Sequence, residues 1–366
     1  MVIYLNSFYD NGFNNLYFRP LLFQNFNFRH PIRFMHDIVL IPGDGIGPEI
    51  TDSVTTILKE AGAEINWIEH IAGLEAQDEV GTPLPDDTLE ALKKYKLALK
   101  GPLTTPVGSG FRSVNVALRK ELKLYSNIRP AKTLPHIESR FDKVDLVMFR
   151  ENTEGLYIGK EQWVEENSHA ESIAVVTRRA SEKIIRAAFE YARKNNRRKL
   201  TLVHKANILK YTCGLFLEVG HDVAKEYQDI HFEDLIVDNM AMQMVMRPEQ
   251  FDVIVTTNLF GDILSDLASG LIGGLGLTGA ANIGDDAAMF EAVHGSAPDI
   301  AGQNKANPTA FLLSALMMLE HIGENRIAKN IRNAIYRTLA DKSVCTPDIG
   351  GTGNTSTYTK AVCKNL

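Results

Sequence analysis

The stretch that decides the fold is NLFGDILSDL (residues 258–267), which follows the apolar run FDVIV (251–255) and precedes the glycine-rich GLIGGLG (270–276). This order predicts a buried strand, a turn and the first turns of a helix. On that helix Asp262 and Asp266 stand four residues apart, with Cβ atoms ~5–6 Å from each other, so their charges repel. Paired carboxylates of this kind suit Mg²⁺ or Mn²⁺. The alternative is a solvated helix start, where the helix dipole favours Asp.

Composition restricts the class of protein and the kind of partner. With 366 residues, of which 45% are hydrophobic and 23% charged, the chain is typical of a soluble α/β protein. A net charge of −6 favours neither nucleic acid nor a membrane surface as partner. No apolar run approaches the ~18–20 residues of a membrane span. Cys213, Cys345 and Cys363 lack any CxxC or metal-ligand spacing, which predicts reduced thiols and a cytoplasmic location, with the mitochondrial matrix as the alternative.

Residues 1–34 differ from the rest of the chain. They are rich in Phe and Asn and show no apolar period of a helix or strand. They match neither a secretory signal nor an amphipathic presequence. We expect this extension to be disordered or weakly packed, and dispensable.

The segment IPGDGIGPE (41–49) resembles a dinucleotide-binding loop, because it joins a predicted strand to a helix beginning near Pro48. Glu69 even ends a predicted strand (65–69) about where a ribose-binding acid would lie. However, its glycines are spaced G-x-G-x-G and are followed by Pro-Glu, which is not the G-x-G-x-x-G pattern. The spacing therefore argues against a Rossmann site.

A second informative block is SVNVALRKEL (113–122). Ser113 fits a helix N-cap, and Asn115 and Arg119 are four residues apart on the helix, so both can face one ligand. Arg129 and Arg150 lie at or beside predicted strands. Because a guanidinium binds a carboxylate through two parallel hydrogen bonds, the three arginines can clamp several carboxylates. The alternative is three separate surface salt bridges.

Several polar residues follow predicted strands. Lys205 comes after the strand 199–203 and is a candidate general base, unless it is a surface lysine. The segment LIVD (235–238) predicts a strand that ends in Asp238, and the Met-rich segment 240–246 predicts a core helix. Open α/β sheets place ligands at the carboxyl ends of strands. The residues predicted at this edge are Arg150, Lys205, Asp238 and Asn258.

Six ordered blocks together resemble the isocitrate/isopropylmalate family of β-decarboxylating dehydrogenases, from Asp37 to about Asn365. They are IPGDGIGPE (41–49), GPLTTPVGSGFRSVNVALRKEL (101–122), FRENTEGLY (149–157), HKAN (204–207), NLFGDILSD (258–266) and HGSAPDIAGQNKANP (294–308). The resemblance implies an α/β two-domain fold with a mixed twisted sheet, not a Rossmann fold. It implies a large domain (35–124 and 273–366), a small domain (125–154 and 178–272) and an arm (155–177) at a homodimer interface.

The resemblance also assigns roles to residues. It implies Tyr157 and Lys205 as the catalytic pair, with Lys205 and Asp238 reaching into the partner's site. The implied Mg²⁺ or Mn²⁺ ligands are Asp238, Asp262 and Asp266. The substrate-binding set is Thr105, Ser113, Asn115, Arg119, Arg129 and Arg150. The cofactor pocket involves His294, Gly295, Asp299, Ile300 and Asn307.

Within the family, Ser113 and Asn115 offer polar contacts to a third carboxylate, which favours isocitrate over 3-isopropylmalate; homoisocitrate is a further alternative. A non-catalytic regulatory subunit is a rival of another class, but Tyr157, Lys205 and the three Asp are all present. Asp299-Ile300 predicts NAD, because a carboxylate there can bind the free ribose hydroxyls and would repel a 2′-phosphate. Asp299 can alternatively cap the following turn.

Overall fold

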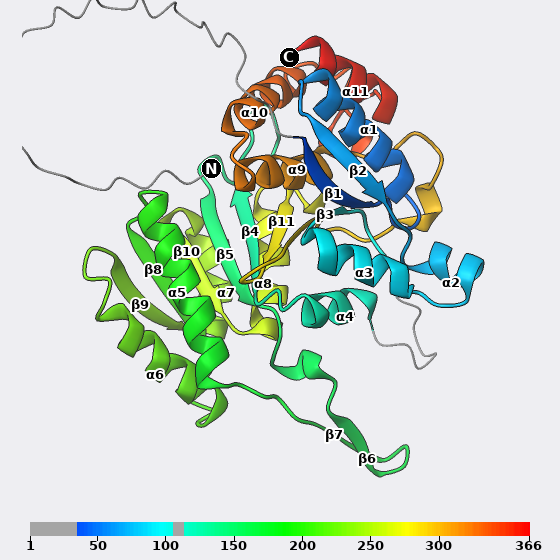
Figure 1. Ribbon diagram of the computed structural model, residues 1–366. Helices are drawn as coiled ribbons and strands as arrows, with labels where there is room; N and C mark the ends of the chain where they lie inside the picture. The colour runs from blue at the N-terminus through cyan, green and yellow to red at the C-terminus, as the bar shows by residue number, and fades with distance from the viewer. Residues whose placement is uncertain (1–34, 105–112) are drawn as a thin grey trace, which may run out of the picture. The chain divides into compact units, whose positions relative to one another are not determined.

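A single mixed sheet organises the computed structural model, which describes residues 35–104 and 113–366 (Figure 1). The expectations for residues 1–34 and for Thr105 lie outside the described residues. Ten strands follow the order β2-β1-β3-β12-β11-β4-β5-β10-β8-β9. Their bounds are β1 (His36–Ile41), β2 (Ile65–Glu69), β3 (Leu97–Lys100), β4 (Ser126–Lys132), β5 (Asp145–Glu151), β8 (Lys199–His204), β9 (His231–Ile236), β10 (Val253–Thr256), β11 (Gly279–Ile283) and β12 (Ala288–Ala292).

The sheet is parallel in its outer parts and antiparallel at its centre. The pairs β12–β11, β11–β4 and β4–β5 are antiparallel, whereas β1, β2, β3 and β12 on one side and β5, β10, β8 and β9 on the other pair in parallel. The strands from β2 to β11 come from both ends of the chain, and those from β4 to β9 from its middle. This confirms the predicted mixed sheet. The division into a large and a small domain stays a prediction.

Helices cover both faces of the sheet. Their bounds are α1 (Gly47–Glu60), α2 (Leu74–Val80), α3 (Asp86–Tyr95), α4 (Val114–Glu121), α5 (Arg178–Lys194), α6 (Thr212–Ala224), α7 (Val237–Met246), α8 (Asn258–Leu271), α9 (Thr309–His321), α10 (Asn325–Leu339) and α11 (Thr355–Lys364). On one face α9 packs on β11 and β12, and α5 packs on β5 and β10. On the other face α8 packs on β4 and β5. No helix within the described residues is long and apolar enough to cross a membrane.

The alternation of side chains along β4 separates two environments. Asn127 and Arg129 point to the face covered by α8, and Ile128 and Pro130 point to the opposite face. Because directly paired residues share a face, Arg150 of β5, the partner of Asn127, joins the first group. The register therefore brings the arginines of two central strands beneath one helix.

The decisive stretch folds as predicted, with β10 followed directly by α8. Two neighbouring predictions were wrong. The predicted strand 235–238 is not one, because β9 ends at Ile236 and Asp238 lies in the first turn of α7. The Met-rich helix is only half core: Met240 and Met244 are fully buried, whereas Met242 and Met246 are 50% and 60% exposed. Residues four apart share one helix face, so alternate methionines point outward.

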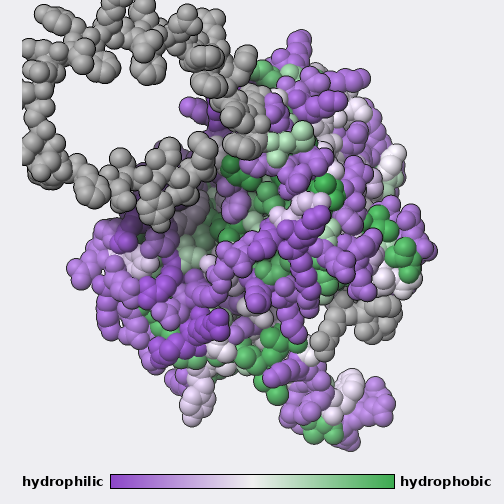
Figure 2. Space-filling model, in the orientation of Figure 1, coloured by the Kyte–Doolittle hydropathy of each residue, from purple (hydrophilic) through white to green (hydrophobic). Residues whose placement is uncertain are grey.

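A two-stranded arm projects from the body of the molecule (Figures 1 and 2). It consists of β6 (Glu161–Glu165) and β7 (His169–Ser172), and every residue of both strands is exposed. Trp163 in this arm is 59% exposed. That this arm lies at a homodimer interface stays a prediction.

Candidate active site

Asp262 of α8 lies at the centre of the candidate site. Its carboxylate accepts hydrogen bonds from Nη1 of Arg150 and from the hydroxyl of Tyr157, which lies in a short 3₁₀ helix (Leu156–Ile158). Burial acts to raise the pKa of Asp262, but the charges of Arg150 and Arg129 and the hydrogen bond from Tyr157 together hold that pKa below its usual value. Burial and the hydrogen bond to Asp262 raise the pKa of Tyr157, so its hydroxyl stays protonated at neutral pH.

Arg150 is held by the start of α8. Its Nε and Nη2 donate to Oδ1 of Asn258 at 3.0 and 2.8 Å. Gly261 is required for this approach, because a Cβ at that position would lie 2.6 Å from Cγ of Arg150. Burial, and then the charges of Arg129 and Arg119, lower the pKa of Arg150 to about 10, so it remains a cation at neutral pH.

Arg129 contacts the second carboxylate of α8, that of Asp266. Its Nη1 donates to Oγ of Ser265 at 2.7 Å and to Oδ1 of Asp266 at 3.3 Å. Burial raises the pKa of Asp266; Arg129 opposes the rise, and the like charge of Asp262 adds to it. The two acids, four residues apart as predicted, thus have pKa shifts of opposite direction because Asp262 has the closer cation.

A cavity of about 140 Å³ brings predicted substrate and cofactor residues together. Asn115, Arg119 and Arg129 line it, and so do His294 and Gly295. Within the described residues, Oδ1 of Asn115, Nε of Arg119 and Nε2 of His294 are buried without a hydrogen-bond partner. Buried polar atoms are nearly always paired, so these three are suited to contact a ligand.

Beneath this cavity lies a buried polar network that was not predicted. Glu291 of β12 pairs with Nζ of Lys100 at 2.8 Å and with Nη2 of Arg119 at 3.2 Å. Asn282 donates to Glu291 and accepts from Asn127, both at 2.8 Å. Burial opposes ionisation, but Lys100 and Arg119 outweigh it and hold the pKa of Glu291 well below its usual value. The network thereby fixes Arg119 relative to β4.

The sequence did contain a signal for this network. Lys100 and Glu291 each interrupt an apolar strand, LALK (97–100) and AMFEA (288–292). Charged residues are almost never fully buried unless they are paired. Two opposite charges in apolar strands therefore indicate a buried ion pair, although only the register shows that they meet.

Lys205 and Asp238 form a separate pair. Lys205 follows β8, and its Nζ donates to the carboxylate of Asp238 on α7. This contact lowers the pKa of Asp238. No hydrogen bond or ion pair links either residue to Asp262 or Asp266 among residues 35–104 and 113–366. Within the same residues no group of three His, Cys, Asp or Glu could hold a metal ion. One chain thus supplies the predicted metal ligands as two separate parts.

The remaining predicted residues lie around the cofactor side. Ser113 is the N-cap residue of α4. Asp299 and Ile300 belong to a 3₁₀ helix (Pro298–Ile300), and the exposed Asp299 carboxylate has no hydrogen bond or ion pair with any described residue, so it does not cap the turn. Asn307 accepts from the backbone N–H of Thr309 at 3.0 Å and donates to Asp348 at 2.9 Å.

The glycine-rich segment 41–49 has a structural role. Asp44 accepts from the backbone N–H groups of Leu74 at 2.9 Å and Thr104 at 2.6 Å. Gly45 has a φ of +61°, and a Cβ there would lie 2.0 Å from the carbonyl oxygen of Ser296. The glycines allow two loops to pack closely, which explains their non-Rossmann spacing.

The isocitrate/isopropylmalate dehydrogenase family model matches residues 37–362. The chain belongs to this family. It is 49% identical over 328 residues to the protein named isocitrate dehydrogenase [NAD] catalytic subunit 5, mitochondrial, of Arabidopsis thaliana, covering 89% of this chain and 87% of that one. It is 49% identical over 306 residues to the chloroplastic 3-isopropylmalate dehydrogenase of Solanum tuberosum, covering 83% and 85%.

The crystal structure of isocitrate dehydrogenase from Methylococcus capsulatus has the same fold. It superposes with a TM-score of 0.88 at 56% identity, covering 90% of this chain and 99% of that one. The predicted fold is thereby confirmed. As a member of the isocitrate/isopropylmalate dehydrogenase family, the protein is an oxidoreductase that acts on a small-molecule substrate.

Proposed function

We propose that the protein catalyses the NAD-dependent oxidative decarboxylation of isocitrate to 2-oxoglutarate and CO₂, with Mg²⁺ or Mn²⁺. The observation that carries the proposal is the convergence of Arg119, Arg129 and Arg150 from α4, β4 and β5 beside the two carboxylates of α8. Isocitrate has three carboxylates, which the arginines can bind, and a hydroxyl. The names of the Arabidopsis and Methylococcus proteins support this substrate, whereas the potato relative of equal identity to the Arabidopsis protein is named for 3-isopropylmalate.

Asn115 favours isocitrate over 3-isopropylmalate. Asn115 lines the same cavity as Arg119, and its Nδ2 amide group can donate a hydrogen bond to a third carboxylate of the substrate. An apolar isopropyl group beside this amide would leave a polar group unsatisfied, at a cost of about 1–3 kcal/mol. Homoisocitrate has the third carboxylate too and stays an alternative that turnover measurements must separate.

The metal would be held by Asp262 and Asp266 of one chain with Asp238 of a second copy. The oxygen-only donors suit Mg²⁺ or Mn²⁺. The side chains of Asp262 and Asp266 are 35% and 54% exposed, so they remain accessible to a cation. Their mutual repulsion, which contributes to the raised pKa of Asp266, is what a cation would relieve. When bound, the metal would act as a Lewis acid on the substrate oxygens.

Tyr157 and Lys205 would move protons. Tyr157 keeps its proton at neutral pH and points it at Asp262, within reach of the groups around α8. It would supply a proton to the product carbon after CO₂ leaves. Lys205 would accept the substrate's hydroxyl proton as NAD⁺ accepts hydride. It now donates a hydrogen bond to Asp238, so engagement of Asp238 by a cation would release the Lys205 amine from this contact.

A homodimer with shared active sites would unite these parts. Exposed apolar residues near Lys205 and on α7 and α8 support a covered surface: Ile208, Tyr211, Met246 and Ile263 are 66%, 91%, 60% and 59% exposed. Trp163 of the arm is a further exposed apolar residue that a second copy would cover. A second copy placing its Lys205 and Asp238 beside Asp262 and Asp266 would complete the three-carboxylate set.

NAD⁺ is the proposed cofactor. The exposed carboxylate of Asp299 has no partner among the described residues and is therefore available to ribose hydroxyls. The compartment stays a prediction: the free cysteines agree with the cytoplasm, whereas the name of the Arabidopsis relative supports the mitochondrial alternative.

One assay tests the proposal against its rivals. The chain, purified alone, is given NAD⁺ and Mg²⁺ with isocitrate, homoisocitrate or 3-isopropylmalate, and NADH is followed by absorbance. We expect isocitrate to give the highest kcat/KM. Faster turnover of 3-isopropylmalate would overturn the substrate assignment. Absence of turnover with all three would favour the regulatory-subunit alternative.

A further inference from the structure

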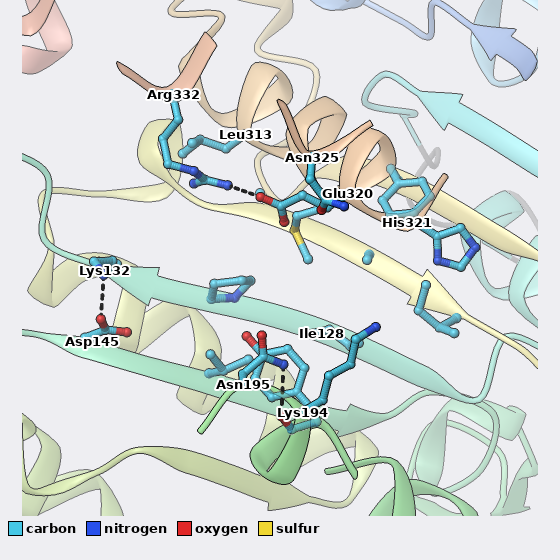
Figure 3. A pocket seen from close by; sticks show the side chains of 18 of the residues that line it. Ile128, Lys132, Asp145, Lys194, Asn195, Leu313, Glu320, His321, Asn325 and Arg332 are labelled. Carbon is cyan, nitrogen blue, oxygen red and sulfur yellow. Dashed lines mark hydrogen bonds and ion pairs between the residues drawn. The ribbon is translucent and has the colours of Figure 1, made fainter. Parts of the chain in front are cut away.

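A cavity of about 670 Å³ lies on the face of the sheet opposite the candidate active site. Its floor is the reverse side of β4, β5, β11 and β12; α5 forms one wall, and α9 and α10 form the other (Figure 3). We call it the reverse cavity. Its volume falls in the range of about 300–1,000 Å³ typical of small-molecule sites. None of the described residues assigned to the active site lines it.

The floor of the reverse cavity is apolar. Ile128, Ala281 and Phe290 form its centre, and the half-buried Leu313 and Met317 of α9 extend it up one wall. Figure 2, which views the molecule from this side, shows hydrophobic residues between α5 and α9 with hydrophilic residues around them. Accessible apolar surface in a concave site favours a ligand with an apolar body.

The rim carries an excess of positive charge. Lys132 pairs with Asp145 at 2.6 Å, Arg197 pairs with the same carboxylate, and Arg332 pairs with Glu320 at 2.7 Å. Those two carboxylates are the acidic residues of the lining, against four Lys and Arg. The fourth cation, Lys194, has no hydrogen bond or ion pair with any described residue. A net positive rim in a chain of net charge −6 indicates a local preference for anions.

Lys194 is directed at the cavity. In Figure 3 it extends from α5 over the strands toward the side of α9. Burial lowers the pKa of His321 on α9, and the ammonium of Lys194 lowers it further, so the positive field of Lys194 reaches the opposite wall. An anion between the two walls would neutralise this field.

The reverse cavity and the active site share their strands. In β4, Ile128 and Pro130 line the cavity, while Arg129 between them faces the active site. In β12, Phe290 lines the cavity and the next residue, Glu291, holds Arg119 on the other side. A displacement of either strand therefore changes both sites together, because the side chains belong to adjacent residues.

We propose that the reverse cavity binds a small organic anion with an apolar body, and that its occupation is coupled to the active site through β4 and β12. The carboxylate or phosphate group of the ligand would meet Lys194, and its body would cover Ile128 and Phe290. An inorganic anion would leave the floor uncovered, and a neutral apolar molecule would leave Lys194 unpaired, so both should bind more weakly.

The probe for the binding test is 8-anilinonaphthalene-1-sulfonate, an aromatic sulfonate whose fluorescence rises in apolar surroundings. The full chain is titrated alongside Lys194→Glu and the control Lys329→Glu, which makes the same charge change on α10 outside the cavity lining. We expect Lys194→Glu to weaken binding by about tenfold, since an attraction becomes a repulsion, and the control to change it less than twofold. Met317→Gln should also weaken binding, by removing apolar surface.

Absence of saturable binding, or equal weakening by Lys194→Glu and Lys329→Glu, would overturn the proposed site. Melting temperatures of the variants must match the parent, so that probe binding to unfolded chain is excluded. Inorganic phosphate at the same concentration should displace little of the probe.

Coupling is measured by repeating the titration with saturating isocitrate and Mg²⁺. Because linkage is reciprocal, a coupled site must show a changed probe affinity, which we expect to be threefold or more. Unchanged affinity, in protein whose NADH production shows that isocitrate binds, would disprove the coupling. If the protein did not turn over isocitrate, the proposed function would be wrong. The probe titration would still test whether the reverse cavity binds an anion.

Discussion

Gly261 of α8 and Arg150 of β5 approach so closely that a Cβ on the glycine would lie 2.6 and 2.7 Å from Cγ and Cβ of the arginine. The missing side chain at position 261 therefore decides where the guanidinium of Arg150 lies. From there it reaches both Asn258 and Asp262.

The first prediction concerns this contact. Gly261→Ala should destabilise the fold by about 1–3 kcal/mol, the usual cost of overpacking, and reduce kcat/KM by displacing Arg150. Gly270→Ala is the matched control on the same helix, because a Cβ at position 270 would meet no atom within 4 Å outside the helix's own backbone. It should stabilise by about 0.5–1 kcal/mol, since Ala favours a helix over Gly. Urea unfolding measures both; a destabilisation no larger at 261 than at 270 would contradict the close contact.

Lys205→Met should reduce kcat by about 10²–10⁴-fold if Lys205 is the general base. Lys360→Met removes a lysine from the exposed surface of α11 and should leave kcat unchanged. Steady-state kinetics at saturating isocitrate and NAD⁺ provide the comparison. A loss under fivefold for Lys205→Met would exclude it from that role.

Glu291→Gln should cost about 3–5 kcal/mol at pH 7, because it leaves the buried charges of Lys100 and Arg119 uncompensated. The folded state lowers the pKa of Glu291 below the value of 4.5 for the free group. Its ionisation therefore contributes full stability above about pH 4.5 and less as the pH falls further. The difference between wild type and variant, measured by urea unfolding, should shrink below that pH. A difference that grows on acidification would contradict this ionisation.

NAD⁺ should be preferred to NADP⁺ by on the order of 10²-fold or more in kcat/KM, because the 2′-phosphate would meet the like charge of Asp299. Asp299→Lys with Ile300→Tyr should shift the ratio toward NADP⁺. Both cofactors must be compared at the same metal and isocitrate concentrations. Equal or better efficiency of the parent with NADP⁺ would refute the assignment.

Local pattern and chemistry predicted much of the candidate site. The β10–α8 unit, the i,i+4 spacing of Asp262 and Asp266 and the rejection of a Rossmann loop all followed from periodicity and spacing. Asp238 was wrongly predicted to end a strand. The apolar run before it fits the end of a strand and the beginning of a helix equally well. The exposed methionines of α7 were missed because apolar composition does not distinguish a fully buried helix from one with an exposed apolar face.

Contacts between residues far apart in the sequence could not be predicted from local patterns. Glu291 meets Lys100 only because β12 lies beside β3, and Asn282 meets Asn127 only through the register of β11 on β4. The reverse cavity arises in the same way, because its lining combines β4 and α5 with β11, α9 and α10, which lie much later in the sequence. Such features depend on strand order, which no local window contains.

The strand order also constrains how the chain can fold as it leaves the ribosome. β3 pairs with β12, so Leu97 cannot pair with Ala288 until that residue has been synthesised, long after β3. The edge of β3 must therefore stay unpaired while the middle strands β4, β5, β8, β9 and β10 assemble among themselves. Unpaired edges promote aggregation, and distant pairings form slowly. During synthesis the unpaired edge of β3 is thus a place where the nascent chain can pair wrongly with another chain.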